Sequence, residues 1–277
     1  MLLLPSTIKK NKKPKNGKTI PPSVSIAKKY FSALDALNKT TDQVTREVFR
    51  MANEGYTASY IFDWIDREKP RIDSQYRANA QSISSQFTES SSNYNREKME
   101  ENFKKSFGVD TATILDDQAT RDLLALKTKQ NVNLIKTIPQ QYFTKIENWV
   151  IQSYTGQLGE QSLDQVLATV NGNNTARAAF IARDQTSKLN GALTQIRHQG
   201  LGIKKYKWKN SQDQRVVGNP SGLYPKGNKG HGDHWHRENK VYAYDNPPSD
   251  GNPGHAYNCR CTAEPIIDLD DMSVTYI

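Results

Sequence analysis

Six histidine and cysteine residues gather near the end of the chain, where they could hold a metal ion. Three histidines fall within six residues, and a fourth follows after a loop together with both cysteines of the chain. The six are His231, His234, His236, His255, Cys259 and Cys261. Imidazole and thiolate groups are the ligands that zinc prefers, and a tetrahedral site could stabilise a domain with few apolar residues.

The spacing of the two cysteines argues against chelation. One residue separates Cys259 from Cys261, so on a strand both side chains point to the same face, whereas a zinc knuckle uses two intervening residues. We therefore expect packed thiols, loop histidines and no cofactor, with a structural zinc as the alternative. Arg260 would favour a thiolate, but nothing in the sequence supplies an oxyanion hole for a cysteine nucleophile.

A metal-dependent nuclease is the competing interpretation of the same segment. In an HNH-like site, His234 would act as general base on water, and Asp233 and Asn258 would complete the set around a divalent metal. Such sites place the last ligand on a following helix, whereas the residues after Asn258 have the pattern of a strand. The sequence also contains no phosphate-binding glycine loop and no G-x-S-x-G elbow. The protein is therefore not expected to be an enzyme.

The elements that would position these residues change in kind near residue 202. Up to that point, long segments carry apolar residues at helical spacing, including a very polar segment from Pro70 to Phe107 with a narrow apolar seam. From residue 203 the stretch IKKYKWK alternates, with Tyr206 and Trp208 on its apolar face. This pattern predicts an α+β protein, mainly helical with long helices, that ends in a small β-containing module with long loops. The expected divisions are a disordered basic arm at 1–27, a helical region at 28–202, the module at 203–268 and an acidic tail at 269–277.

Composition limits the class of the protein. The chain has 277 residues, of which 35% are hydrophobic, and its mean hydropathy is -0.78, so much of its surface must be solvated. No apolar run approaches the roughly 20 residues that a membrane span needs, and an apolar start followed by proline and lysines is not typical of a signal peptide. Two cysteines make no disulfide framework, so a reducing cytosol is the expected compartment.

Most of the net charge of +9 comes from the N-terminal end of the chain. Residues 1–34 contain eight lysines and no acidic residue, and the proline and glycine content of the arm predicts disorder. One interpretation is a solubilising tail. The other is a flexible polycation that contacts nucleic acid phosphates or an acidic protein surface without sequence specificity. The lysines expected at such a contact are Lys9, Lys10, Lys12, Lys13, Lys15 and Lys18.

The order of motifs in the module resembles the C-terminal module of the phage Mu F-like minor head proteins, also called phage head morphogenesis proteins. A Tyr/Trp strand, an Asp-x-Arg-Val segment, a Pro-Pro turn and an Asn-Cys-Arg-Cys strand follow one another. The matching residues are Trp208, Asp213, Arg215, Val216, Pro247, Pro248, Asn258, Cys259, Arg260, Cys261 and Pro265. Arg183, Thr186 and Asn190 also match the helix that precedes the module in that family. A longer loop displaces the family histidine, which could be His231, His234 or His236.

The resemblance implies a structural protein of the virion. Members are minor components inside the head, associated with the portal protein, and they act in head morphogenesis and in genome packaging or delivery after synthesis in the host cytoplasm. Major capsid or scaffolding protein are the further partners that it implies, and packaged DNA is the partner that it suggests for the arm. Contact with a membrane is not expected. Within the module we expect Tyr206, Trp208, Tyr242 and Tyr244 in the core. We also expect Arg215 and Arg260 to be anchored by Asp213 or Asn258.

Overall fold

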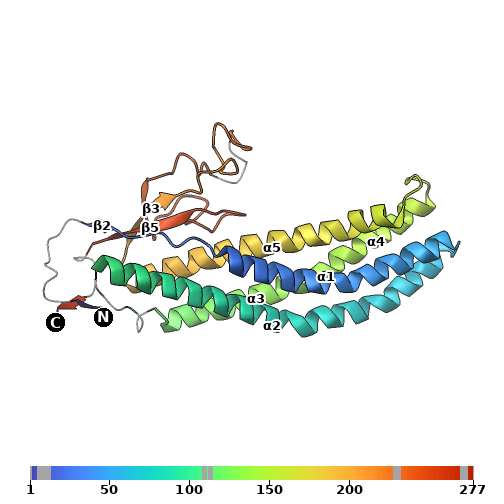
Figure 1. Ribbon diagram of the computed structural model, residues 1–277, viewed down its shortest axis with the longest axis horizontal. Coiled ribbons are helices and arrows are strands. Elements are labelled where there is room, and N and C mark those ends of the chain that lie inside the picture. Colours follow the sequence, from blue (N-terminus) through green and yellow to red (C-terminus); the bar gives the residue numbers. More distant parts are fainter. Residues whose placement is uncertain are drawn as a thin grey trace. The chain divides into compact units, whose positions relative to one another are not determined.

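A computed structural model describes residues 2–4, 14–107, 111, 115–226, 232–268 and 274–276 of the chain. The described residues form five helices, labelled in Figure 1: α1 (Val24–Asn53), α2 (Ala58–Phe107), α3 (Gln118–Lys136), α4 (Ile138–Tyr154) and α5 (Leu163–Gly200). A small antiparallel sheet lies near the C-terminal end of the sequence. The predicted class, α+β and mainly helical with long helices, is confirmed.

The sheet has the strand order β2-β5-β3-β4, and all its neighbouring strands are antiparallel. Its strands are β2 (Lys15–Asn16), β3 (Lys205–Lys209), β4 (Val241–Ala243) and β5 (Thr262–Ile267). On β3, Trp208 lies opposite Ala263 of β5, and Tyr206 lies between Pro265 and Tyr242. A second, parallel pair joins β1 (Leu2–Leu4) to β6 (Val274–Tyr276). The expected aromatic strand, β3, is therefore one of the two inner strands of the sheet and pairs with a neighbouring strand on each side.

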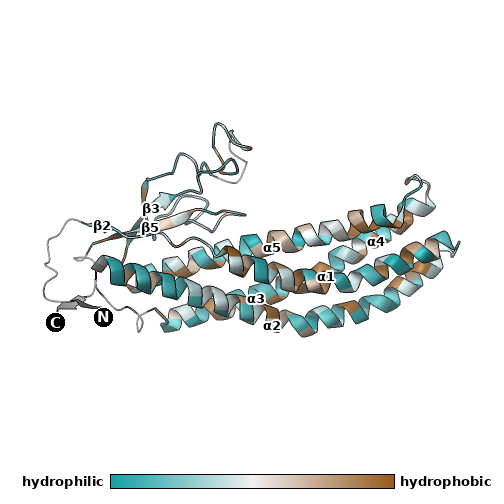
Figure 2. Cartoon of the chain, in the orientation of Figure 1, coloured by the Kyte–Doolittle hydropathy of each residue, from teal (hydrophilic) through white to brown (hydrophobic). Residues whose placement is uncertain are grey.

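The helices follow the expected apolar spacing but break at other places. Most of their residues are hydrophilic, with hydrophobic residues at intervals (Figure 2). Gly55, with a φ of 80°, lies between α1 and α2, although the apolar spacing continues on both sides of it. Helix α5 runs without a break through Gly172. It begins with a capping box in which the backbone N–H groups of Ser162 and Gln165 each donate to the other's side chain.

Contacts divide the chain into two compact units, and α2, α3 and α5 contribute residues to both. One unit comprises residues 25–87 and 128–182, and its described secondary structure consists of helices alone. Its buried tyrosines keep hydrogen-bond partners, as Tyr76 donates to Asn38 at 2.9 Å and Tyr30 donates to Asn131 at 2.9 Å. These bonds matter because burying a hydroxyl without a partner costs about 1–3 kcal/mol. Among the described helices, none combines the length and the apolar character that crossing a bilayer requires.

The other unit, which we call the sheet unit, comprises residues 1–24, 88–127 and 183–277. Trp208 and Tyr206 are 1% and 0% exposed, which confirms the predicted buried face of β3. Tyr244 is buried in the same core, and Tyr242 packs against it. The core also includes residues of α2 and the two cysteines. The expected division at residue 202 is therefore not the edge of a compact unit, since parts of three helices belong to the sheet unit.

A close approach of a loop to α5 explains why the helix belongs to this unit. A Cβ atom at Gly191 would lie 2.5 Å from the carbonyl oxygen of Pro253, so only glycine lets the loop sit against the helix. His198, also on α5, shares a 2.6 Å hydrogen bond with the hydroxyl of Tyr244. Burial lowers the pKa of His198 to about 3, so its ring is neutral near pH 7.

The expected disordered arm is wrong for its described part. Lys15 and Asn16 pair with β5, and the N–H of Gly17 donates to Pro265 at 2.9 Å. Ile20 is 2% exposed in the core of the sheet unit, and its carbonyl accepts a 2.7 Å hydrogen bond from Asn190. Pairing with β5 provides hydrogen-bond partners for the backbone of this polar segment, and the composition could not predict this pairing. Residues 5–13 and 269–273 lie outside the described residues, whereas residues 274–276 of the predicted tail form β6.

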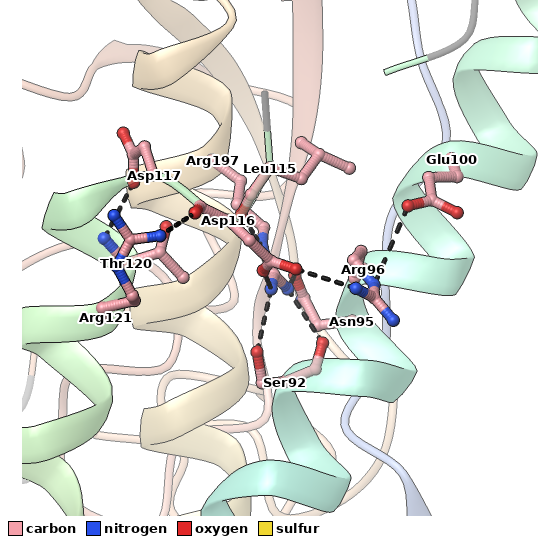
Figure 3. Close-up of polar contacts among 10 residues, drawn as sticks. All are labelled: Ser92, Asn95, Arg96, Glu100, Leu115, Asp116, Asp117, Thr120, Arg121 and Arg197. Atoms are coloured by element: carbon pink, nitrogen blue, oxygen red, sulfur yellow. Dashed lines mark hydrogen bonds and ion pairs between the residues drawn. The ribbon is translucent and has the colours of Figure 1, made fainter. Parts of the chain in front are cut away.

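A buried guanidinium joins three segments of the sheet unit, as Figure 3 shows. The side chain of Arg197 on α5 is 0% exposed. Its five N–H groups have five acceptors at 2.9–3.0 Å, contributed by Ser92 and Asn95 of α2 and by Leu115 and Asp116 of the following segment. Burial lowers the pKa of Arg197, and the Asp116 carboxylate opposes that effect. Every donor of the group is satisfied, which is what burial of a guanidinium requires.

The Arg197→Ala substitution should lower the free energy of unfolding by on the order of 3 kcal/mol or more, because it leaves buried acceptors without donors. Arg96→Ala is the matched control, since Arg96 bonds the same Asp116 at 2.8 Å from a position that is 36% exposed. Its expected cost is about 0–1 kcal/mol. Urea unfolding followed by far-ultraviolet circular dichroism measures both, and equal midpoints for the two variants would contradict the role given to Arg197.

Candidate functional site

The two cysteines and one histidine of the predicted set lie together beside the start of β5, an inner strand of the sheet. Cys259 and Cys261 lie just before β5, and both are buried. His234 lies on the loop between β3 and β4, where the N–H of Trp235 donates to Val217 at 3.0 Å. The ring of His234 packs edge-on against Trp208, with centroids 5.1 Å apart. The buried face of β3 therefore sets the position of the histidine.

Both sulfur atoms approach the same ring nitrogen. Nδ1 of His234 lies 3.6 Å from Sγ of Cys259 and 3.5 Å from Sγ of Cys261. The three ligand atoms lie within 4.8 Å of one another, and all three residues are buried. The one-residue spacing does place the thiols on the same side, as expected. What the spacing could not show is that a histidine from another loop faces both of them.

The opposite nitrogen of His234 is held by a carboxylate. Nε2 lies 2.8 Å from Asp250, whose side chain is 8% exposed. Arg237 and the backbone N–H of Gly232 also donate to Asp250, at 2.5 Å and 2.8 Å. Arg237 in turn stacks over the Trp208 ring at 4.9 Å. The carboxylate accepts a hydrogen bond from the Nε2–H group, so the ring is oriented with Nδ1 toward the sulfurs.

The same contacts shift the acidities of these groups. Burial disfavours the charged form of His234, but Cys259 and Asp250 outweigh burial and raise its pKa. The hydrogen bond from Cys261 lowers the pKa of the Cys259 thiol well below its usual range, and His234 adds to this effect. The pKa of Asp250 is lowered because Arg237 and His234 outweigh the effect of burial. These contacts therefore favour the thiolate form of Cys259.

A cavity of about 240 Å³ opens on this cluster. His234, Cys259 and Cys261 all line it. Three arginines, Arg183, Arg215 and Arg260, also line the cavity, together with two tyrosines. A small molecule or ion in the cavity would therefore meet the sulfur atoms and a positively charged wall.

The remaining histidines of the predicted set do not join the cluster. His236 is exposed, and its Nδ1 lies 2.5 Å from Asp233 on the same loop. His255 is exposed as well. His231 lies outside the described residues. Within the described residues, only His234 of the four candidate histidines therefore faces the thiols.

The arrangement gives no support to the nuclease alternative. The Asp233 carboxylate faces His236, while both ring nitrogens of His234 are engaged by Asp250 and the sulfurs. Asn258 donates its backbone N–H to Asp184 of α5 at 2.8 Å. Its φ of 55° marks a turn, and β5 follows instead of a helix. Among the described residues, Asp233 and His234 do not share a metal-binding group of histidine, cysteine and acidic residues.

The motif residues outside the cluster have structural contacts. Arg260 makes a bidentate ion pair with Asp213, at 2.5 Å and 2.7 Å, as expected of a polar anchor. Arg215 differs from the expectation, since its side chain is 61% exposed and 3.8 Å from Asp213. Pro248 accepts the N–H of Gly251 at 2.8 Å in the turn after the exposed Pro247. The sequence did not single out Asp250 or Arg237, because an acidic and a basic residue in polar loops carry no local signal.

Comparison with known proteins adds one relative. No family model matches the chain, and no solved structure shows significant similarity to it. The chain is 35% identical over 198 residues to an uncharacterized protein of Haemophilus influenzae. The alignment covers 70% of this chain and 41% of that protein, so the chain spans about two fifths of the length of its relative.

The contribution of the Arg260–Asp213 ion pair to stability should be measurable by comparison with the neighbouring Arg215. Arg260→Ala should lower the free energy of unfolding by about 1 kcal/mol, the upper end for a partly exposed bidentate pair, whereas Arg215→Ala should change it by less than about 0.5 kcal/mol. Chemical unfolding of both variants at pH 7 provides the comparison.

The pH dependence gives the control. Arg260 lowers the pKa of Asp213 below its ordinary value of 3.8, so the contribution of the pair is complete above that pH. It disappears as the pH falls through the lower, folded-state pKa. At a pH where Asp213 is protonated in both the folded and the unfolded protein, the difference between the two variants should disappear. A difference that persists there unchanged would contradict the assignment.

Proposed function

We propose that the protein is a non-enzymatic minor head protein of a phage, related to the Mu F-like family. It would lie inside the head, associated with the portal protein, and act in head morphogenesis and genome packaging or delivery. The proposal rests on the motif order in residues 203–268. The observation that carries it is that the residues of this motif pack together in the sheet unit.

The contacts of the motif support a structural role. Trp208, Cys259 and Cys261 are in one buried cluster, and Arg260 is paired with Asp213. Asn190, which matches the helix before the module, donates to the backbone of Ile20. Residues that match the family therefore fix the fold of the unit, which supports a structural role for the unit.

The geometry also favours one histidine for the family position. The resemblance leaves His231, His234 and His236 open. Among the described candidates, His234 is buried against the motif residues Trp208 and Cys261, whereas His236 is exposed. We assign His234 to the family position, because a motif residue with a structural role should contact the other motif residues.

Particles produced by the phage that encodes the chain should contain it. Mass spectrometry of purified, nuclease-treated heads is expected to detect the chain at a few copies per particle. Deletion of the gene should reduce the yield of filled heads in electron micrographs, and expression of the intact chain in trans should restore that yield. Absence of the chain from purified heads would overturn the proposal. Retained function of a Cys259→Ser, Cys261→Ser double variant would agree with a structural role, provided that the variant folds.

The proposed contact of the arm with DNA needs a different variant from a deletion of residues 1–27. That deletion would remove β2 and the buried Ile20. Substitution of Lys9, Lys10, Lys12 and Lys13 by Gln leaves both in place, while Lys15 and Lys18 remain as exposed lysines beside the sheet. The quadruple variant should bind duplex DNA more weakly, and its slope of log K against log salt should fall by up to about 3.6, since each phosphate contact contributes about 0.9.

The matched control removes the same charge elsewhere. Lys28, Lys29, Lys39 and Lys136 are exposed on helices α1 and α3. Their substitution by Gln lowers the net charge by the same amount and should leave most of the binding and its salt slope intact. Equal losses in the two quadruple variants would show that net charge, not the arm, determines DNA binding.

A further inference from the structure

We propose that His234, Cys259 and Cys261 bind one Zn²⁺ ion through Nδ1 and the two sulfur atoms, with the fourth coordination position open to the adjoining cavity. This site is independent of the proposed role in the phage head. It differs from the expectation of packed thiols without a cofactor. The argument against zinc was the Cys-x-Cys spacing, and the third ligand from a separate loop removes that objection.

The distances match those of a zinc site. With Zn–N bonds of about 2.0–2.1 Å, Zn–S bonds of about 2.3 Å and tetrahedral angles, the nitrogen and sulfur ligand atoms lie about 3.5–3.6 Å apart. The two observed separations from Nδ1 are 3.6 Å to Cys259 and 3.5 Å to Cys261. Nδ1 has one lone pair, so it can accept only one good hydrogen bond from a thiol. Two sulfurs at equal distance from one nitrogen are better explained by a shared metal ion.

The surroundings of the three ligands are those of a metal centre. Zinc-bound histidines donate their second N–H to a carboxylate that fixes the ring, and Asp250 does so here at 2.8 Å. Arg237 and Gly232 hold that carboxylate in turn. The indole N–H of Trp208 is buried, has no well-formed hydrogen bond among the described residues and interacts with the sulfur of Cys261. A metal-bound thiolate at the neighbouring Cys261 would supply an acceptor for it.

The open position follows from the lining of the cavity. All three ligand residues line the same cavity of about 240 Å³, so an ion held among them has access to it. Sites with three protein ligands complete the tetrahedron with water or an exogenous ligand. Three arginines line the wall and one of them, Arg260, is paired with Asp213, so the remaining positive charge favours an anion there.

Metal content and spectroscopy of the full-length protein test the proposal. Protein purified under reducing conditions with zinc in the medium should contain one zinc per chain by elemental analysis. Replacement by Co²⁺ should give the thiolate-to-cobalt charge-transfer band and the intense visible bands of tetrahedral cobalt. A protein that takes up neither metal when both thiols are titratable, or one in which both thiols are oxidised to a disulfide as isolated from a reducing cytosol, would overturn the proposal.

Two aspartates provide a matched pair of variants. Asp250→Asn removes the carboxylate that orients His234 and should weaken the affinity for Zn²⁺ by about 10–100-fold, as measured by competition with a chromophoric chelator. Asp233→Asn removes the carboxylate that faces His236 at the surface and should leave the affinity unchanged.

The direct ligand variants complete the test. Cys261→Ser should lose the zinc, whereas His236→Ala and His255→Ala should retain it. Circular dichroism of each variant shows whether it is folded. If Cys261→Ser does not fold, the Asp250→Asn and Asp233→Asn pair decides, and equal affinities for zinc in those two variants would refute the site.

Discussion

The guanidinium of Arg197 is the interaction on which the sheet unit depends most directly. Its five N–H groups bond to acceptors on α2 and on the segment before α3, while its own backbone belongs to α5. A buried guanidinium that lacked even one partner would be costly, so these bonds form together or the charge cannot be buried. Helix α5 is thereby fixed in register against α2. The loop residues Asn252, Pro253 and Asn258 contact the same helix α5.

A chain with 35% hydrophobic residues needs such polar contacts. The core of its sheet unit combines aliphatic residues such as Leu115 and Ile203 with aromatic side chains, some of which carry polar groups, and with the two cysteines. Tyr206 donates to Asn252 at 2.7 Å, and the Tyr244 hydroxyl is hydrogen-bonded to His198. Polar groups of this kind specify one arrangement because a shifted register would leave them unsatisfied. The same principle accounts for the ordered segment around Ile20, since the carbonyl of a buried residue needs a donor, and Asn190 provides it.

The sequence allowed the fold class, the long helices and the buried face of β3 to be predicted, because each depends on local periodicity. The positions where helices end were harder to predict from the sequence. Gly55 lies in a segment whose apolar spacing continues on both sides, and Gly172 sits inside a helix without ending it. The cluster of His234 with the cysteines was predicted only as a set of residue types. Its geometry depends on Arg237 and the Val217 carbonyl, which lie on the same connection as His234, and on Asp250, which lies beyond β4. No spacing rule relates these two connections, because they meet only in the folded chain.

Under the proposed relation to the Mu F-like family, His234 would illustrate how a motif can tolerate a change in loop length. The ring of His234 is positioned by Trp208 on one side and by Asp250 on the other, and the next residue is bonded to Val217. None of these contacts involves the glycine-rich segment between residues 218 and 231. Lengthening a surface loop costs only about 0.6 kcal/mol for each doubling, so the segment can grow while both ends stay fixed. A match to the Mu F-like pattern should therefore be judged by which histidine reaches the Cys-x-Cys pair in space, because its distance along the sequence carries little physical constraint.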